Sequence, residues 1–467
     1  MLTRLDKFKD NLLKFGVAAI LIAVPLYQKF PFLKIPGTYV SIRLEDFLIF
    51  FVSLFWLASI NFDIRKLFKN RVGVAIALFW AIGLVSIISG IFLTETVSAH
   101  IGILHWGRRI EYMIGFYIGY RALTDRANLS FFVKCLMIVV FAVFLYGLGQ
   151  KYLSWPVITT QNDEYSKGVA LRYMPGGHLV STFAGHYDMA TYMILVLPLF
   201  IMILVLPKAR KSLNLGIPDK FAVLVVSIVV ACGMWLLMNT ASRISLPSFV
   251  LSVTIALFLL RKYKAVAIFF VVTVIFASLT SNLTARYGQI FDVLFKKINS
   301  SSYILNPIHY AFAEEDSLRR KSTETLPPAP VIVIEDRSTS IRLNVEWPRA
   351  IRAFTKNPFL GTGLSSITLA TDNDYLRLLG EVGILGFLGF FLIFVNLAIL
   401  VFKKVWKLKT FGLRTAFIVG MAGAIPGVFL NGVFIDVFES SKLAIIFWFM
   451  IGFLYNLVEL SGNETDI

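Results

Sequence analysis

The sequence predicts an all-α polytopic membrane protein, and three observations carry this prediction. Hydrophobic residues make up 57% of the chain and the mean hydropathy is +0.75, values that are rare among soluble proteins. Apolar runs close to the ~20 residues needed to cross a bilayer recur along the whole chain. Lys and Arg gather in the short segments between these runs, so the net charge of +17 does not indicate a nucleic-acid partner.

The apolar runs predict about twelve transmembrane helices, of which those near residues 12, 45 and 245 are the shortest. An even number of spans places both termini on the same side of the membrane. The runs lie at 12–27, 45–60, 72–93, 103–120, 130–150, 185–206, 220–239, 245–260, 265–281, 374–402, 412–431 and 442–459.

The orientation follows from the charges of the loops. Basic loops face the cytoplasm in most membrane proteins, and the short loops on the other side are much poorer in Lys and Arg. Both termini are therefore expected in the cytoplasm. The basic loops hold Arg65, Lys66, Lys69 and Arg71; Arg121 and Arg126; Lys208, Arg210, Lys211 and Lys220; Arg261, Lys262 and Lys264; and Lys403, Lys404, Lys407 and Lys409.

Two long segments are then external, and long loops in compact proteins usually carry function. The first spans 151–184. The second spans 282–373, between the ninth and tenth helices, and its middle, Glu314 to Arg337, has the charge and proline content of a mobile segment or an edge strand. We thus expect helices one to nine in residues 1–281, an external loop domain in 282–373, and helices ten to twelve in 374–467.

Three external arginines are candidate ligand-binding residues. Arg172 lies in the first long loop, Arg243 in a tight turn between two helices, and Arg342 in the second long loop. Arginine presents a rigid fork of donors that matches phosphate oxygens. The alternative for each is that the side chain only reaches toward lipid headgroups.

The segment from Arg337 to Gly386 joins a soluble helix to a membrane helix. Leu343, Trp347, Ala350, Ile351 and Phe354 recur at helical spacing as an apolar stripe, with Arg342, Glu346 and Arg349 on the opposite face. Pro348 fits a first helical turn, and the segment from Asn357 to Gly363 predicts a tight turn. Asp372, Asn373 and Asp374 then precede the next apolar run, either as a site or as a helix cap.

Other polar residues have plainer explanations. Arg108, Arg109 and Glu111 fit a structural ion-pair cluster. Cys135 and Cys232 lie inside apolar runs, as buried thiols do. The external histidines, His178, His186 and His309, lack metal-ligand spacing with acidic support, so neither a metal nor a cofactor is expected. The chain has no phosphate-binding loop, dinucleotide fingerprint or hydrolase motif.

These parts allow metal-independent glycosyl transfer on a carrier lipid. Arg172, Arg243 and Arg342 would hold the diphosphate of a lipid-linked donor and stabilise the charge of the leaving group. Asp372 would act as general base or orient the acceptor hydroxyl. Asn373 would position the acceptor or Asp372, and Asp374 is the alternate base.

The sequence resembles the O-antigen ligase and O-antigen polymerase superfamily of bacterial membrane glycosyltransferases. The order and sidedness of four segments carry the resemblance, which covers most of the chain from about residue 150 onward. The segments are STFAGHYDMATY at Ser181–Tyr192, NTASR at Asn239–Arg243, RLNVEWPRAIRAFTKNPFLGTG at Arg342–Gly363 and DNDYLRLLGEVGILG at Asp372–Gly386.

The resemblance implies a GT-C-like fold in the bacterial cytoplasmic (inner) membrane and transfer of a glycan from undecaprenyl diphosphate in the periplasmic leaflet. Ligases place the glycan on lipid A-core during lipopolysaccharide synthesis, whereas polymerases extend another lipid-linked glycan. The family arginines correspond to Arg172, Arg243 and Arg342. Ligases commonly have His-Asn where this chain has Asp372-Asn373, so a polymerase, or a relative with another acceptor, is at least as consistent.

Two other classes of function remain open on the sequence. A solute or anion transporter also has about twelve helices, although transporters place charges and broken helices near the membrane midplane. A non-catalytic assembly partner would use the same arginines for complex formation.

Overall fold

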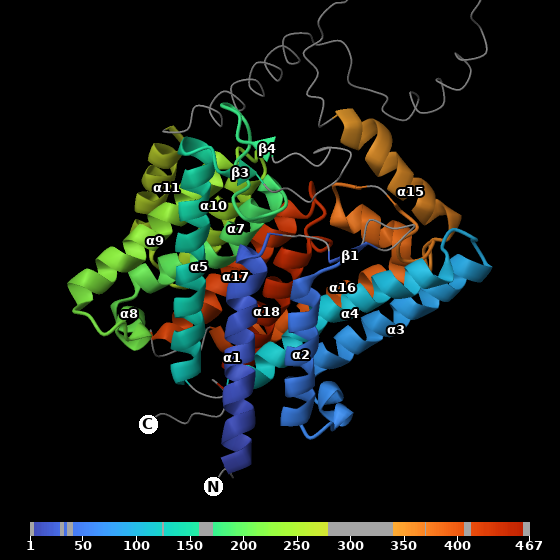
Figure 1. The fold of residues 1–467 in the computed structure, drawn as a ribbon, viewed down its shortest axis with the longest axis horizontal. Helices are drawn as coiled ribbons and strands as arrows, with labels where there is room; N and C mark the ends of the chain where they lie inside the picture. The colour runs from blue at the N-terminus through green and yellow to red at the C-terminus, as the bar shows by residue number, and fades with distance from the viewer. Residues whose placement is uncertain are drawn as a thin grey trace, which may run out of the picture.

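A computed structural model describes residues 4–28, 32–34, 41–123, 126–157, 171–278, 340–368, 370–405 and 412–460. These residues form helices almost throughout (Figure 1). The helices are α1 (Arg4–Leu26), α2 (Leu44–Ser59), α3 (Arg71–Phe92), α4 (Ala99–Ala122), α5 (Arg126–Tyr152), α7 (His186–Val205), α8 (Pro207–Leu213), α9 (Asp219–Asn239), α10 (Ser245–Leu259), α11 (Tyr263–Ser278), α15 (Trp347–Lys356), α16 (Asp374–Val405), α17 (Leu413–Asn431) and α18 (Ser441–Leu460), with a 3-10 turn at Ile64–Phe68 and a π turn at Arg342–Glu346.

Two short antiparallel ribbons are the extended elements of the described residues. Strand β1 (Leu33–Lys34) pairs with β2 (Ser41–Ile42), with Leu33 opposite Ile42. Strand β3 (Pro156–Val157) pairs with β4 (Leu171–Arg172), with Pro156 opposite Arg172. Ribbons of two residues per strand add little stability, so the fold depends on helix packing.

The prediction of an all-α polytopic membrane protein is confirmed. Each of the twelve expected apolar runs coincides with a helix. Among the described residues, seven helices are long and apolar enough to cross a membrane: α3, α5, α7, α9, α16, α17 and α18. Helices α10 and α11 are apolar but shorter. Length and composition thus support seven of the roughly twelve expected membrane crossings.

Much of the two expected external loops lies outside the described residues. This holds for 158–170 in the first loop and for 279–339 and residue 369 in and around the second, including the whole Glu314–Arg337 segment. The described part of the second loop is the π turn, α15 and the chain that leads from α15 into α16.

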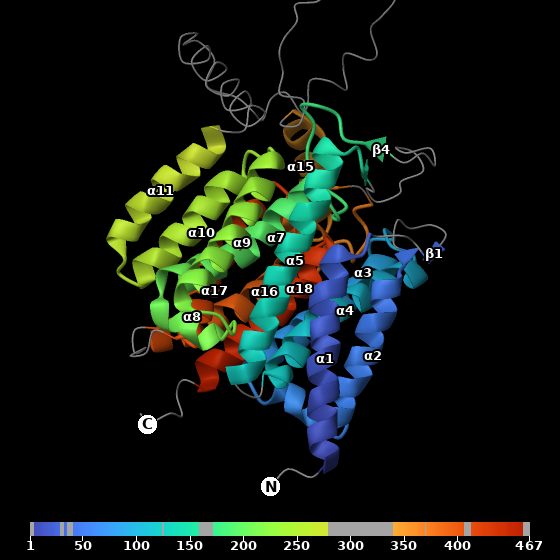
Figure 2. The ribbon, with the colours of Figure 1, turned by 60° about the vertical axis from the view of Figure 1, so that its left-hand side comes forward.

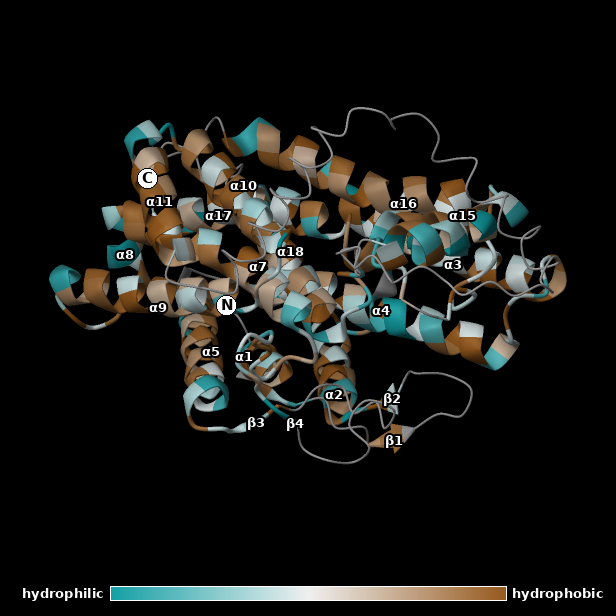
Figure 3. Cartoon of the chain, turned by 90° about the horizontal axis from the view of Figure 1, so that it is seen from above, coloured by the Kyte–Doolittle hydropathy of each residue, from teal (hydrophilic) through white to brown (hydrophobic). Residues whose placement is uncertain are grey.

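Helices α7 and α18 form the centre of the molecule. Nearly every side chain from Met189 to Ile203 and from Ser441 to Tyr455 is buried. Helix α7 packs against α17, α9 and α10, while α18 packs against α4. Seen from above, α7 and α18 lie in the middle, and hydrophilic residues gather on α15, along α4 and at helix ends (Figure 3). Apolar outer helices thus surround two buried central ones.

Helix α16 is interrupted at Gly383, where the backbone has φ +65° and ψ −171°. Only glycine adopts this conformation readily, and a Cβ at this position would meet the carbonyl oxygen of Phe359. The backbone groups that lose their partners at this break form hydrogen bonds with the chain after α15. Ile384 N–H donates to Pro358 O at 2.9 Å, and Gly363 N–H donates to Glu381 O at 2.9 Å. This exchange of backbone bonds fixes α15 against α16.

Helix α15 begins at Trp347, with Pro348 in its first turn, as expected. Its apolar stripe is divided: Ala350 is fully buried, whereas Leu343 and Ile351 are about half exposed, at 52% and 48%. The opposite face turns inward, because the Arg342 side chain is only 12% exposed. A soluble helix would bury its apolar stripe, so this orientation indicates a helix at a membrane interface.

Candidate functional site

The centre of the candidate site is an ion pair between Arg342 and Asp372. Arg342 Nε and Nη2 donate to Asp372 Oδ2 at 3.0 and 2.8 Å. The two side chains are 12% and 28% exposed, respectively. Asp372 has φ +49°, a conformation that aspartate tolerates better than most residues. The fold therefore brings together two predicted site residues that lie 30 positions apart.

Tyr187, in the first turn of α7, forms the other side of this pair. Arg342 Nη2 donates to Tyr187 Oη at 3.4 Å, and the guanidinium carbon lies 6.0 Å from the centre of the tyrosine ring. The His186 ring lies 3.9 Å from both the Tyr187 and the His178 rings, measured between centroids. Aromatic rings from the 178–187 segment thus form a wall beside Arg342.

The turn that carries Arg243 lies against this wall. His178 Nδ1 and Thr240 O are 2.7 Å apart, and Leu179 N–H donates to Asn239 O at 3.1 Å. Below the turn, Asn431 of α17 donates to Thr191 Oγ1 at 2.6 Å. It also shares hydrogen bonds of 3.2–3.3 Å with Ser245, which in turn contacts Ser242. A buried polar network therefore holds the Arg243 turn next to the 178–187 segment.

Asn373 and Asp374 face different partners from Asp372. Asn373 Oδ1 accepts from Tyr375 N–H at 3.0 Å and from Leu376 N–H at 2.9 Å, which is the geometry of a helix cap. Asp374 is buried and accepts from Val437 N–H at 2.8 Å and Phe438 N–H at 3.2 Å. Of the three predicted polar residues, Asp372 is the one that contacts Arg342.

Asp436, between α17 and α18, binds several residues at the start of α16. It accepts from the backbone N–H groups of Thr371 at 2.8 Å and Asn373 at 3.1 Å. Arg377 Nη1 also donates to it, at 3.0 Å. These hydrogen bonds fix the backbone on both sides of Asp372.

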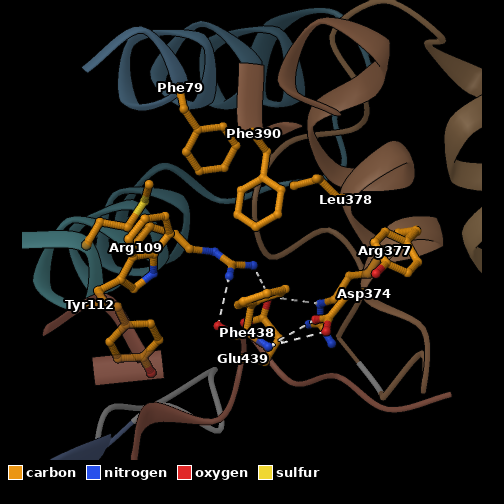
Figure 4. A pocket seen from close by; sticks show the side chains of 12 residues that line it. Phe79, Arg109, Tyr112, Asp374, Arg377, Leu378, Phe390, Phe438 and Glu439 are labelled. Atoms are coloured by element: carbon orange, nitrogen blue, oxygen red, sulfur yellow. Dashed lines mark hydrogen bonds and ion pairs between the residues drawn. The ribbon is translucent and has the colours of Figure 1, made fainter. Parts of the chain in front are cut away.

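Asp374 also lines a cavity of about 500 Å³, a volume that includes the space at its open mouth (Figure 4). Arg109 points toward Phe438 and Glu439, donates to Phe438 O at 3.1 Å, and forms an ion pair with Glu439. Phe79 and Phe390 line the opposite wall. The charged groups here bind one another, and the expected ion-pair role of Arg108 and Arg109 is confirmed, since Arg108 also pairs with Asp46 at 2.8 Å.

Arg172 lies apart from this cluster in terms of contacts. It is exposed on β4, and its side chain forms no hydrogen bond or ion pair with the described residues. Strand β4 and α15 nevertheless lie at the same end of the molecule, opposite the first turn of α1 (Figures 1 and 2). The geometry therefore joins Arg342 to Asp372, places the Arg243 turn nearby, and leaves Arg172 at the rim.

The site raises the pKa values of its carboxyl groups. Burial, with the charge of Asp436, raises the pKa of Asp372 above its usual value, and Arg342 opposes this rise. Burial and the charges of Asp372 and Asp436 raise the pKa of Glu346 to about 7. The pKa of Arg342 is raised despite burial, because of its bonds to Tyr187 and Asp372. A carboxyl group that titrates near neutrality suits proton transfer.

Sequence reasoning missed several members of this site. Arg377 and Glu381 interrupt an apolar run, and charges inside membrane helices are usually functional or paired, so that signal was available. Asp436 and Glu439 stand in the short loop before the last helix. Tyr187 lies in the Ser181–Tyr192 segment that carries the resemblance, but only the packing of α7 brings it to Arg342.

Comparison with known proteins agrees with this geometry. The family model described as O-antigen ligase matches residues 226–391. This stretch holds Arg243, Arg342, Asp372, Asn373 and Asp374, but not Arg172. No curated protein matches the chain. The match covers three of the four segments that carry the sequence resemblance, all but Ser181–Tyr192, and so confirms the resemblance to the O-antigen ligase and polymerase superfamily over residues 226–391.

Proposed function

We propose that this protein transfers or polymerises a glycan from an undecaprenyl-diphosphate-linked donor at the outer face of the bacterial cytoplasmic membrane. The observation that carries the proposal is the contact between Arg342 and Asp372, beside the Arg243 turn. A family match to O-antigen ligases supports a membrane enzyme that moves glycans. The same match gives no support to a transporter.

Arg342 and Arg243 would hold the donor diphosphate. Guanidinium groups bind phosphate oxygens through two parallel hydrogen bonds, and their charge stabilises the diphosphate as it leaves the sugar. Arg342 already binds Asp372, so an incoming diphosphate competes with Asp372 for the same donors. Arg172, at the rim, would contact the more distant part of the donor. This assignment requires no metal ion, and activity is expected to persist in EDTA.

Asp372 would orient the acceptor. Arg342 donates twice to Oδ2, while no described residue donates to Oδ1. Oδ1 can therefore accept a hydrogen bond from a sugar hydroxyl group. Arg342 occupies Oδ2 and offsets part of the rise in the pKa of Asp372 that burial causes, so we assign Asp372 to orientation of the acceptor and not to proton abstraction. Asn373 caps α16 and thereby fixes the backbone that presents Asp372.

The acceptor is either another lipid-linked glycan, a lipid A-core or a different hydroxyl-bearing molecule. Because Asp372 stands where ligases commonly have histidine, we favour polymerisation or an acceptor other than lipid A-core. Both termini would lie in the cytoplasm, since the basic loops indicate this orientation and α1 begins at the end opposite α15 (Figures 1 and 2).

The test uses the purified full-length protein in lipid nanodiscs with undecaprenyl-diphosphate-linked oligosaccharide and each acceptor class separately. We expect one acceptor to grow, with and without EDTA. Arg342→Ala and Arg243→Ala should each slow turnover by about a hundredfold or more, the usual effect of removing a charge-stabilising donor. Arg352→Ala, an exposed arginine on α15, is the matched control and should keep the wild-type rate. Uptake of a solute into liposomes without any glycan transfer would overturn the proposal.

A further inference from the structure

The inward face of the π turn and α15 carries three charged side chains: Arg342, Glu346 and Arg349. Residues four and three positions apart lie on one face of a helix, and π turns recur at functional sites. Arg342 is engaged by Asp372 and Tyr187. By contrast, Glu346 Oε2 and Arg349 Nη1 are buried and have no hydrogen-bond partner among the described residues.

Such atoms are costly in a protein that binds nothing at this place. A buried polar group without a partner costs about 1–3 kcal/mol, and native structures contain few of them. Here an acceptor atom and a donor atom without partners stand one turn apart, immediately beside Arg342. A sugar hydroxyl group both donates and accepts, so this pair of atoms matches a carbohydrate ligand.

The surroundings of Glu346 differ from those of Asp372. Arg342 and Arg349 act on Glu346 from its own segment, Asp372 from the mouth of α16, and Asp436 from the segment between α17 and α18. Neither arginine forms an ion pair within 4.0 Å of Glu346 in the described structure, whereas Arg342 holds Asp372 at 2.8 Å. Glu346 is therefore a second carboxyl group beside Arg342, and its Oε2 has no hydrogen-bond partner among the described residues.

We propose that Glu346 is a catalytic residue that binds the reacting hydroxyl of the acceptor glycan and takes its proton, with Arg349 holding a neighbouring acceptor hydroxyl. This inference rests on the proposed function and assigns the proton transfer that Asp372 leaves open. The acceptor O–H bond breaks and the proton goes to Glu346 Oε2. The acceptor oxygen bonds to the anomeric carbon, whose bond to the diphosphate oxygen breaks. The electron pair leaves on the diphosphate, next to Arg342.

The titration of Glu346 suits this role. Its pKa of about 7 means that the carboxylate form, which accepts the proton, prevails above neutrality. A proton acceptor is most effective when its pKa lies near the working pH. The rate of the wild-type enzyme should therefore rise through about pH 7 and reach a plateau above it.

The experiment measures steady-state kinetics and pH profiles of the full-length protein in nanodiscs, with the acceptor that the wild type extends. Glu346→Gln should lower kcat by about a hundredfold or more, the contribution typical of general base catalysis, and should abolish the rise near pH 7. Glu346→Asp should restore part of the rate. Binding of undecaprenyl diphosphate should stay within about twofold of the wild type. Glu95→Gln, at an exposed carboxylate of the α3–α4 loop, is the matched control.

A purely structural role is distinguished by stability. The folded-state pKa of Glu346 is raised, so the carboxylate destabilises the folded protein increasingly as pH rises through about 7. Glu346→Gln should thus unfold at the same or a higher temperature than the wild type at pH 8. An active wild type with Glu346→Gln equally fast and equally pH-dependent would overturn this inference alone. A lower unfolding temperature in both Glu346 variants, with matching losses of activity, would also overturn it. A wild type that extends no acceptor rejects the proposed function itself.

Discussion

At the scale of single residues, the site depends on a shared partner. Arg342 serves as the ligand of Asp372 in the structure and as the proposed ligand of the donor diphosphate. Removing one member of a partly buried ion pair leaves the other with its charge uncompensated. In the proposed mechanism, Asp372 would hold Arg342 in place until the donor diphosphate replaces the carboxylate as its partner.

This competition predicts opposite effects of Asp372→Ala on binding and on turnover. The variant frees Arg342, so undecaprenyl diphosphate should bind more tightly, by several-fold. Turnover should fall, because the acceptor loses the oxygen that orients it. Donor affinity by isothermal titration and kcat by product analysis measure the two effects separately. Weaker donor binding in Asp372→Ala would show that the carboxylate supports the diphosphate site instead of competing with it.

At the scale of elements, the backbone contact between α16 and the segment after α15 sets the geometry of the candidate site. Helix α16 breaks at Gly383, and its freed backbone groups bond to the 358–363 segment. Hydrogen bonds to another segment of the same chain therefore replace those that the break removes from α16. Glu346 ends the π turn directly before α15, and Asp372 lies two residues before α16, so this joint sets the distance between the two carboxyl groups.

Gly383→Ala should weaken this joint. An alanine cannot adopt the observed backbone without a cost of about 1–3 kcal/mol, and its Cβ would meet the Phe359 carbonyl oxygen. We expect a lower unfolding temperature and reduced transfer activity, both measurable in detergent or nanodiscs. Gly107→Ala is the control: a Cβ there meets no atom within 4 Å, and alanine stabilises a helix by about 0.5–1 kcal/mol over glycine. Equal stability of the two variants would refute the importance of the joint.

At the scale of the whole molecule, the fold separates a basic end from a site end. Helix α8, with Arg210 and Lys211 in its last turn, lies below α15 and β4 in the view of Figure 1. Because basic loops face the cytoplasm, Arg342 and Asp372 are expected at the outer face. The ribbons of α5 and α9, near α8 and β4, are mostly hydrophobic in Figure 3.

Labelling of single cysteines tests this orientation. In a chain whose Cys135 and Cys232 are replaced by alanine, Met174→Cys, 77% exposed beside β4, should react with a membrane-impermeant maleimide in intact spheroplasts. Lys211→Cys, exposed on α8, should react only after the membrane is opened. The reverse pattern would place the site in the cytoplasm and exclude a donor in the outer leaflet.

The sequence by itself determined the class of the protein and the order of its helices, because apolar length and loop charge are local properties of the chain. It also identified Arg342 and Asp372 and the turn that ends α15. Only the tertiary structure decided which residues meet. Tyr187 reaches Arg342 from 155 positions away, Asp436 braces the Asp372 loop from another helix connection, and Asp374 turns inward to the amides of 437–438. Contacts of this kind arise from the packing of distant helices, and no local pattern in the sequence encodes them.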